Sequence, residues 1–266
     1  MNFIVNIKNN LDFYIRQKMR FTRKGFCPEH ESKGKLFDAN KAKEFAIQKE
    51  KEYLEKYNLH NLKNDSSKRN YLENLYIIEL LEKYIDVNNS KNSIKILDIG
   101  SRNWFYATGQ HNFFKYKNWE KEIFLTGIEL DAFRVYSSFY SRYDSAMYNI
   151  RNLENTRYIA GDFLEHFEKY DYMCCFFPFV IQEPLIHWGL PLKHFKPADI
   201  FEHAYKHLNN DGKMLILNQG EEEYLVQQTI LKELGIVFEP RGEFESVFLE
   251  QEHKIFVLSI KKQGIC

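Results

Sequence analysis

The stretch IKILDIGSRNW, Ile94 to Trp104, decides the fold that the sequence predicts. It begins as an apolar run typical of a buried strand and then reaches an acid, Asp98, and a glycine, Gly100. Glycine adopts a left-handed backbone readily and lets the chain approach a ligand closely where a helix starts. The pattern therefore indicates a ligand site at the carboxyl end of a strand.

Short apolar runs alternate with helical stretches from Ile94 onward. Strands are expected at 94–99, 123–128, 157–160, 172–177, 213–217, 236–248 and 254–261, and helices at 104–117, 131–149, 197–208 and 221–234. Strands separated by helices need crossover connections, and the last two strands should form a hairpin. The predicted fold is α/β, with a seven-stranded, mostly parallel, doubly wound sheet and an antiparallel edge strand.

The N-terminal third shows helical periodicity and no convincing strand. We predict a helical extension or cap over residues 1–88 and a ligand-binding domain over 89–266. Residues 1–26 carry six Lys and Arg residues against Asp12 alone, with aromatic residues between them. Contact with RNA or an anionic surface is one interpretation. An amphipathic segment docked on its own domain is the favoured one.

Composition restricts the classes of protein. A hydrophobic fraction of 44% in 266 residues supports a substantial core and excludes a mainly disordered chain. Lys+Arg and Asp+Glu both number 37, so no global basic field favours a polyanionic partner. No apolar run approaches the roughly 18 residues of a membrane span. The four cysteines, Cys27, Cys174, Cys175 and Cys266, are interpreted as reduced thiols in a cytoplasmic protein.

Three successive strands place an acid at the same edge of the predicted sheet, namely Asp98, Glu129 and Asp162. Each acid alone is explained equally well as the N-cap of a following helix. Open parallel sheets, however, bind ligands beyond the carboxyl ends of their strands. A carboxylate after the second strand accepts hydrogen bonds from ribose hydroxyls, and Phe163 beside Asp162 offers a ring for a purine face. Together these residues predict a site for an adenosine.

Five segments of the chain resemble the class I S-adenosylmethionine-dependent methyltransferases over about residues 92–262. They are LDIGS (97–101), GIELD (127–131), AGDF (160–163), FFPF (176–179) and LNNDGKMLIL (208–217). The resemblance implies methyl transfer from S-adenosylmethionine as cofactor. It places Asp98, Gly100 and Ser101 at the methionine end, Glu129 at the ribose, Leu130, Asp162 and Phe163 at the adenine, and Phe177 beside the cofactor.

The first motif departs from the family. The family usually has Asp-x-Gly-x-Gly-x-Gly, whereas here Arg102 and Trp104 replace two glycines. A catalytically degenerate domain that binds a partner through its N-terminal helices is therefore an alternative. A dinucleotide site is disfavoured, because no glycine follows Gly100 before Gly109.

Several weaker candidates lie near the predicted site. In the segment 178–191, His187 and Glu183 are candidates for a general base, and Trp188 for stacking on a substrate; a packed lid explains them equally well. Tyr140 and Tyr143 are candidates for an aromatic substrate pocket, although a helix stripe packed on the sheet is favoured. His203 and His207 have zinc-ligand spacing, but no third ligand is apparent, so no metal is predicted. A small-molecule acceptor is favoured over nucleic acid.

Overall fold

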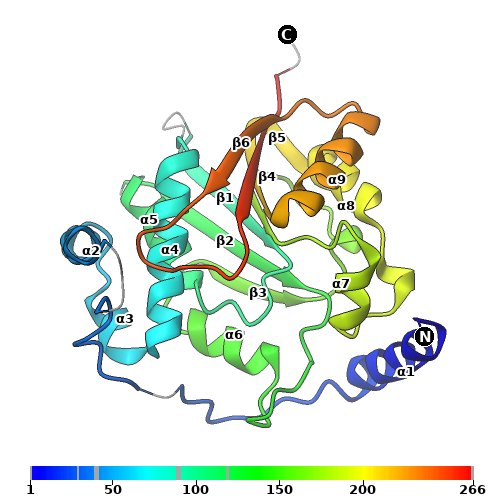
Figure 1. The fold of residues 1–266 in the computed structure, drawn as a ribbon, viewed down its shortest axis with the longest axis horizontal. Helices are drawn as coiled ribbons and strands as arrows, with labels where there is room; N and C mark the ends of the chain where they lie inside the picture. Colours follow the sequence, from blue (N-terminus) through cyan, green and yellow to red (C-terminus); the bar gives the residue numbers. More distant parts are fainter. Residues whose placement is uncertain (1, 29, 39–41, 88–90, 118–119, 265–266) are drawn as a thin grey trace.

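The structure is a computed structural model that describes residues 2–28, 30–38, 42–87, 91–117 and 120–264. Seven strands in these ranges form one sheet in the order β3-β2-β1-β4-β5-β7-β6 (Figure 1). They are β1 (Ser93–Ile99), β2 (Glu122–Glu129), β3 (Thr156–Ala160), β4 (Tyr170–Phe176), β5 (Leu208–Gln219), β6 (Glu239–Phe244) and β7 (Ile255–Lys261).

The predicted seven-stranded, mostly parallel sheet is confirmed. Parallel pairing joins β3, β2, β1, β4 and β5, whereas β7 runs antiparallel to both of its neighbours. The predicted hairpin is formed by β6 and β7, and the antiparallel strand β7 lies between β5 and the edge strand β6. The carboxyl ends of β1, β2 and β4 consequently meet at one edge, where the sequence predicts the ligand site.

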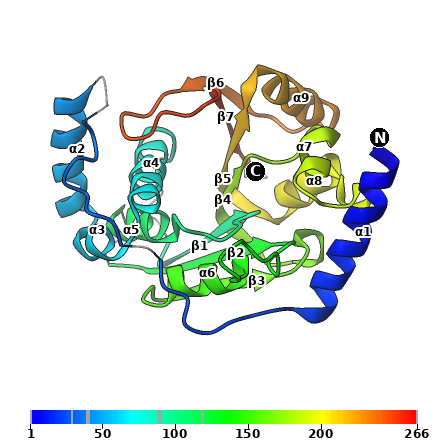
Figure 2. The ribbon, with the colours of Figure 1, turned by 60° about the horizontal axis from the view of Figure 1, so that its bottom comes forward.

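Helices cover both faces of the sheet (Figure 2). They are α1 (Asn2–Met19), α2 (Lys43–Lys56), α3 (His60–Asp65), α4 (Lys68–Tyr84), α5 (Ala107–Lys117), α6 (Arg142–Ile150), α7 (Gln182–His187), α8 (Pro197–His207) and α9 (Gly220–Glu233). Side chains alternate along each strand, so Cys174 joins the core under α4 and α5, and Cys175 joins the core under α8 and α9. The adjacent cysteines thus belong to different cores.

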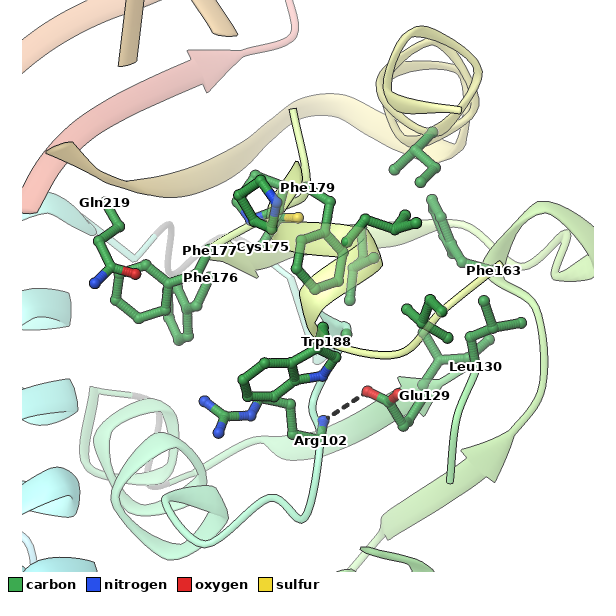
Figure 3. Close-up of a pocket in the computed structure, with 18 of the residues that line it drawn as sticks. Arg102, Glu129, Leu130, Phe163, Cys175, Phe176, Phe177, Phe179, Trp188 and Gln219 are labelled. Atoms are coloured by element: carbon green, nitrogen blue, oxygen red, sulfur yellow. Dashed lines mark hydrogen bonds between the residues drawn. The ribbon is translucent and has the colours of Figure 1, made fainter. Parts of the chain in front are cut away.

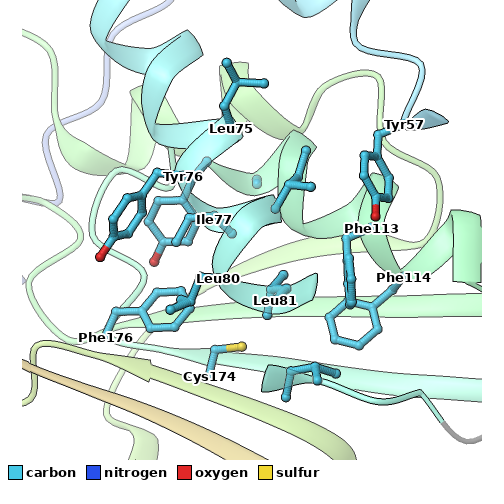
Figure 4. Close-up of a cluster of buried hydrophobic side chains, with 14 of the residues drawn as sticks. Tyr57, Leu75, Tyr76, Ile77, Leu80, Leu81, Phe113, Phe114, Cys174 and Phe176 are labelled. Atoms are coloured by element: carbon cyan, nitrogen blue, oxygen red, sulfur yellow. The ribbon is translucent and has the colours of Figure 1, made fainter. Parts of the chain in front are cut away.

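Helix α4 belongs to the same hydrophobic core as the sheet. Leu80 and Leu81 of α4 lie over Cys174 and Phe176 of β4 (Figure 4). Asn74 is fully buried and joins α4 to α5, because it donates to Phe105 O (2.8 Å) and accepts from Gly109 N (2.7 Å). Residues 88–90 lie outside the described ranges, and the domain boundary at 88 stays a prediction. Within the described ranges, no helix combines the length and apolar character required to cross a bilayer.

The helix predicted over 131–149 is wrong in its first half. Helix α6 starts only at Arg142, because Ser141 and Asp144 form a reciprocal capping box at its N-terminus. Phe139 has a φ of 61°, a left-handed conformation that interrupts a helix. The aromatic spacing between residues 133 and 147 therefore belongs to a turn followed by a short helix.

Candidate functional site

A cavity of about 540 Å³ lies beyond the carboxyl ends of the central strands. Gly100 follows β1, Glu129 ends β2, Gly161 follows β3, Phe176 ends β4 and Gln219 ends β5, and all five line it. Figure 3 shows Glu129, Leu130 and Phe163 on one side, Gln219, Phe176 and Phe177 on the other, and Trp188 between them. A cavity of this size and position is typical of a small-ligand site in an α/β sheet.

The turn after β1 keeps a left-handed backbone at all three positions where the family motif has glycine. The φ angles are 74° at Gly100, 57° at Arg102 and 43° at Trp104. A left-handed conformation costs a non-glycine residue roughly 1–2 kcal/mol. At Gly100, a Cβ would meet no atom within 4 Å. The open space beside this glycine is a cradle in which a ligand can approach the backbone.

Trp104 and Arg102 are held in these conformations by specific contacts. The ring of Trp104 is fully buried, and its Nε1 donates to Gln110 Oε1 (3.1 Å). Arg102 N donates to Glu129 Oε2 (2.9 Å), and Arg102 O accepts from the Tyr158 hydroxyl (2.5 Å). Helix α5 consequently starts at Ala107 and not at residue 104 as predicted from the sequence.

Asp98 and Ser101 lie beneath this turn and do not line the cavity. Ser101 Oγ donates to Ile128 O (3.4 Å), and Asp98 Oδ1 accepts from the Tyr106 hydroxyl (3.1 Å). Complete burial raises the pKa of Asp98 to about 7, and the hydrogen bond from the Tyr106 hydroxyl opposes this effect. Asp98 Oδ2 has no hydrogen-bond partner among the described residues. Both residues support the turn from below, with no contact to the cavity.

Glu129 has a remaining acceptor position. Its Oε1 accepts from Asp131 N (2.9 Å) and Arg142 Nη1 (3.1 Å), and its Oε2 accepts from Arg102 N (2.9 Å). A carboxylate offers about four lone-pair sites, so the second site on Oε2 is left for a ligand. The buried guanidinium of Arg142 neutralises the carboxylate. Sequence reasoning missed Arg142, because nothing in the pattern distinguishes it from a solvated arginine at a helix start.

The other predicted cofactor residues also line the cavity: Leu130, Asp162, Phe163 and Phe177. Asp162 caps the short 3-10 helix Phe163–Glu165 through a hydrogen bond from Leu164 N to Oδ1 (3.0 Å). Asp162 is therefore an N-cap, and it also borders the cavity. Phe163 is buried and presents its ring edge to His203, with centroids 4.9 Å apart.

The segment after β4 closes one side of the cavity. Trp188 lines it, with the guanidinium of Arg102 at 4.8 Å and that of Arg142 at 5.4 Å from its ring. Such distances are typical of cation–π contacts. His187 lines the cavity too, whereas Glu183 is exposed outside it. Glu183 lies in the first turn of α7, from which its side chain does not reach the site.

Tyr140 and Tyr143 do not line the cavity, which corrects their assignment to a substrate pocket. The Tyr140 hydroxyl donates to Gly25 O (3.0 Å), and its ring meets Phe26 edge to face at 5.2 Å. Tyr143 stacks on Phe133 at 5.7 Å. Tyr140 therefore contacts the N-terminal segment, and Tyr143 contacts the turn before α6.

Helix α4 supplies cavity residues that sequence reasoning missed. Arg69, Glu73, Tyr76 and Ile77 line it, joined by Gln219 from the far end of β5. Burial raises the pKa of Glu73, and the nearby guanidinium of Arg69 opposes this effect. Arg69 and Glu73 lie at i, i+4 spacing on α4, but the same helix carries other charged residues, such as Glu79 and Glu82, so no local signal marks this face. Within the described residues, α4 is the only part of the predicted cap that reaches the cavity.

The rings of His203 and His207 lie tilted to one another with centroids 4.1 Å apart, but both face carbonyl groups. His203 Nε2 lies 2.7 Å from His166 O, and His207 Nδ1 lies 2.9 Å from His203 O. Among the residues that the structure describes, no group of three His, Cys, Asp or Glu side chains is placed to hold a metal ion.

Comparison with solved structures identifies the fold. A proposed class I S-adenosylmethionine-dependent methyltransferase from Listeria monocytogenes matches with a TM-score of 0.52 at 13% identity, over 73% of this chain and 60% of that one. This chain has the class I methyltransferase fold. This chain also matches a methyltransferase from Pyrococcus furiosus, with a TM-score of 0.49 at 20% identity, over 73% of this chain and 84% of that one. No family model and no curated protein matches the sequence.

Proposed function

We propose that this protein transfers a methyl group from S-adenosylmethionine to a small-molecule acceptor. The observation that carries the proposal is the juxtaposition of Gly100 and Glu129 on one cavity wall. Gly100 leaves open space for a ligand beside the backbone, and Glu129 keeps one acceptor position. The left-handed conformation of Arg102 and Trp104 supports cofactor binding despite the missing glycines.

The cavity residues divide into a group that would bind the cofactor and a group that would bind the methyl acceptor. Glu129 would accept from a ribose hydroxyl, Asp162 and Phe163 would contact the adenine, and Gly100 would lie at the methionine end of the cofactor. When bound, S-adenosylmethionine would supply an electrophilic methyl group on a sulfonium sulfur. Residues of this chain need only orient the acceptor, exclude water and accept a proton where one is released.

The acceptor would occupy the part of the cavity between α4 and the end of β5. Glu73 of α4 and Glu223 beside the end of β5 line the cavity there, His187 of α7 lines it as well, and each of them is available to accept a proton. Burial raises the pKa of Glu73 and so makes its carboxylate a stronger base than an exposed glutamate. The net charge of zero and the closure of the cavity by Trp188 favour a small molecule over nucleic acid.

Calorimetric titration with S-adenosylmethionine and S-adenosylhomocysteine, with NAD as control, tests the cofactor. We expect micromolar Kd values for both sulfur compounds. Gly100→Leu should weaken binding at least about tenfold, because the side chain enters the open space. Gly235→Leu is the matched control, since Gly235 also has a positive φ and open space around its Cβ but lies away from the cavity.

Two results would contradict the proposal. A folded protein that binds neither sulfur compound would favour the alternative of a catalytically degenerate binding protein. Equal loss of binding in Gly100→Leu and Gly235→Leu would show that backbone strain, and not the cavity, is responsible. Transfer of labelled methyl from the cofactor to RNA or DNA, but to no small-molecule extract, would overturn the acceptor class.

A further inference from the structure

Helix α1 is attached to the domain by its polar side. Asn9 Nδ2 donates to Ile186 O (2.9 Å), and Arg16 donates from Nε and Nη2 to the two carboxylate oxygens of Asp131 (2.8 and 3.1 Å). Gln17 Nε2 donates to a backbone carbonyl beside the cavity at 2.9 Å. Figure 2 shows α1 along the outside of the molecule, next to α7. The predicted docking of this segment is present, and an apolar cluster supports these hydrogen bonds, because Phe13 of α1 is buried against Leu185, Ile186 and Leu190.

The opposite side of α1 is apolar and exposed. At 100° per residue, its members fall on one half of the helix, the apolar stripe, which the exposed Lys8 and Lys18 share. Their exposed fractions run from 43% to 76%, and they are Phe3, Ile4, Ile7, Leu11, Tyr14, Ile15 and Met19. A helix on a globular protein normally buries its apolar side and exposes its polar side. In α1, Phe13 and Val5 pack on the domain, whereas this larger apolar side is exposed, which indicates that an apolar medium covers it.

Positive charge is concentrated around this stripe. Lys8, Lys18, Arg20, Arg23 and Lys24 are all exposed. The first 26 residues hold six cations and one acid, which leaves 31 cations against 36 acids in the rest of the chain. The protein is therefore neutral as a whole but has its excess of positive charge in residues 1–26, where Lys8, Arg16 and Lys18 lie on α1 and three further cations directly follow it.

We propose that α1 lies in the plane of an anionic lipid bilayer and anchors the protein to its surface. An apolar face buried at the headgroup boundary and flanked by lysine and arginine is the arrangement that binds anionic lipids. At 1.5 Å per residue, the 18-residue helix offers a contact about 27 Å long. The excess of acids elsewhere orients the remainder of the protein away from the membrane.

Two other partners fit these observations less well. A second copy of the chain paired along the same stripe would bring both sets of cations together, because a twofold interface joins identical surfaces. RNA would satisfy the cations, but Ile4, Ile7 and Leu11 have no ring on which a base can stack.

Flotation of the full chain with lipid vesicles tests the proposal. We expect binding to vesicles of phosphatidylcholine and phosphatidylglycerol in equal parts, and weak binding to phosphatidylcholine alone. Ile7→Gln/Leu11→Gln should reduce binding at least about tenfold, because two exposed aliphatic side chains lose their burial in lipid. Leu225→Gln/Val237→Gln, which changes exposed aliphatic residues elsewhere, should bind as the wild type does. Lys8→Gln/Lys18→Gln should bind more weakly and depend less on salt.

Three outcomes would overturn the membrane proposal. The first is equal binding by the Ile7→Gln/Leu11→Gln variant and the wild type. The second is a dimer in sedimentation without lipid that dissociates in that variant, which would assign the stripe to a second copy. The third is binding of single-stranded RNA, with no vesicle binding, that is lost in Lys8→Gln/Lys18→Gln. None of these measurements depends on methyl transfer, so they stand apart from the cofactor titration.

Discussion

The ring of Trp104 occupies the space that a side chain at position 127 would need: a Cβ built on Gly127 would lie 2.7 Å from Trp104 Cε3. Gly127 is in the middle of β2, where it pairs with Asp98 on one side and Tyr158 on the other. The absence of a side chain there lets a tryptophan replace a motif glycine. Trp104 therefore fits at this position only because residue 127 is a glycine.

Gly127→Ala should destabilise the protein by about 1–3 kcal/mol, because neither the central strand nor the buried ring has room to move. Gly161→Ala is the matched control, since the nearest neighbour of its Cβ would be 3.8 Å away. The measurement is the free energy of unfolding in urea. Equal losses in the two variants would refute the steric relationship.

The pair Glu129–Arg142 gives a second prediction. Both side chains are buried, so Arg142→Met leaves a carboxylate without its cation and should cost about 3 kcal/mol or more. Arg151→Met, at an exposed position just beyond the same helix, should cost less than about 0.5 kcal/mol. Thermal unfolding of both variants checks the difference. A loss at Arg142 no larger than at Arg151 would mean that the ion pair is not needed to hold Glu129.

Asp98 should lower the free energy of unfolding as the pH rises. Its pKa rises from 3.8 to about 7 on folding, so between these values the folded state holds a proton that the unfolded state has released. Its contribution is therefore complete below about pH 4 and is lost as pH rises towards 7, at up to about 1.4 kcal/mol per pH unit.

Asp98→Asn keeps an acceptor for the Tyr106 hydroxyl and removes this titration. We expect the difference in unfolding free energy between the variant and the wild type to grow in favour of the variant from pH 4 to pH 7. In this difference between variant and wild type, the contributions of other acids with a raised pKa, such as Glu73 and Glu223, cancel. A difference that stays constant with pH would contradict the assignment.

Trp188 should report ligand binding. Its ring is about one-third exposed and lines the cavity, whereas Trp104 is buried outside it. S-adenosylhomocysteine should shift tryptophan emission to the blue by excluding water from the ring. Trp188→Phe should remove the shift and keep the affinity, because an aromatic face remains for Arg102. A shift that persists in Trp188→Phe would place the ligand elsewhere.

Part of the site was predictable from local sequence. Asp98, Gly100, Glu129 and Asp162 follow short apolar runs, and strand periodicity places them at one edge of the sheet. Glu129 and Gly100 border the cavity, as their positions at the strand ends predict, whereas Asp98 lies below it. Arg69 and Arg142 were missed, because their position depends on how helices pack and not on the residues around them.

The sequence by itself determined the alternation of strands and helices, the closing hairpin and the edge of the sheet that carries the acids, since each follows from periodicity within a few residues. Only the tertiary structure decided the rest. Tertiary contacts keep Arg102 and Trp104 in left-handed conformations, because Gly127 and Glu129 on the neighbouring strand receive them. Tertiary contacts also orient α1, because Asp131, the carbonyl groups near α7 and the apolar cluster around Phe13 supply partners that no local pattern reveals.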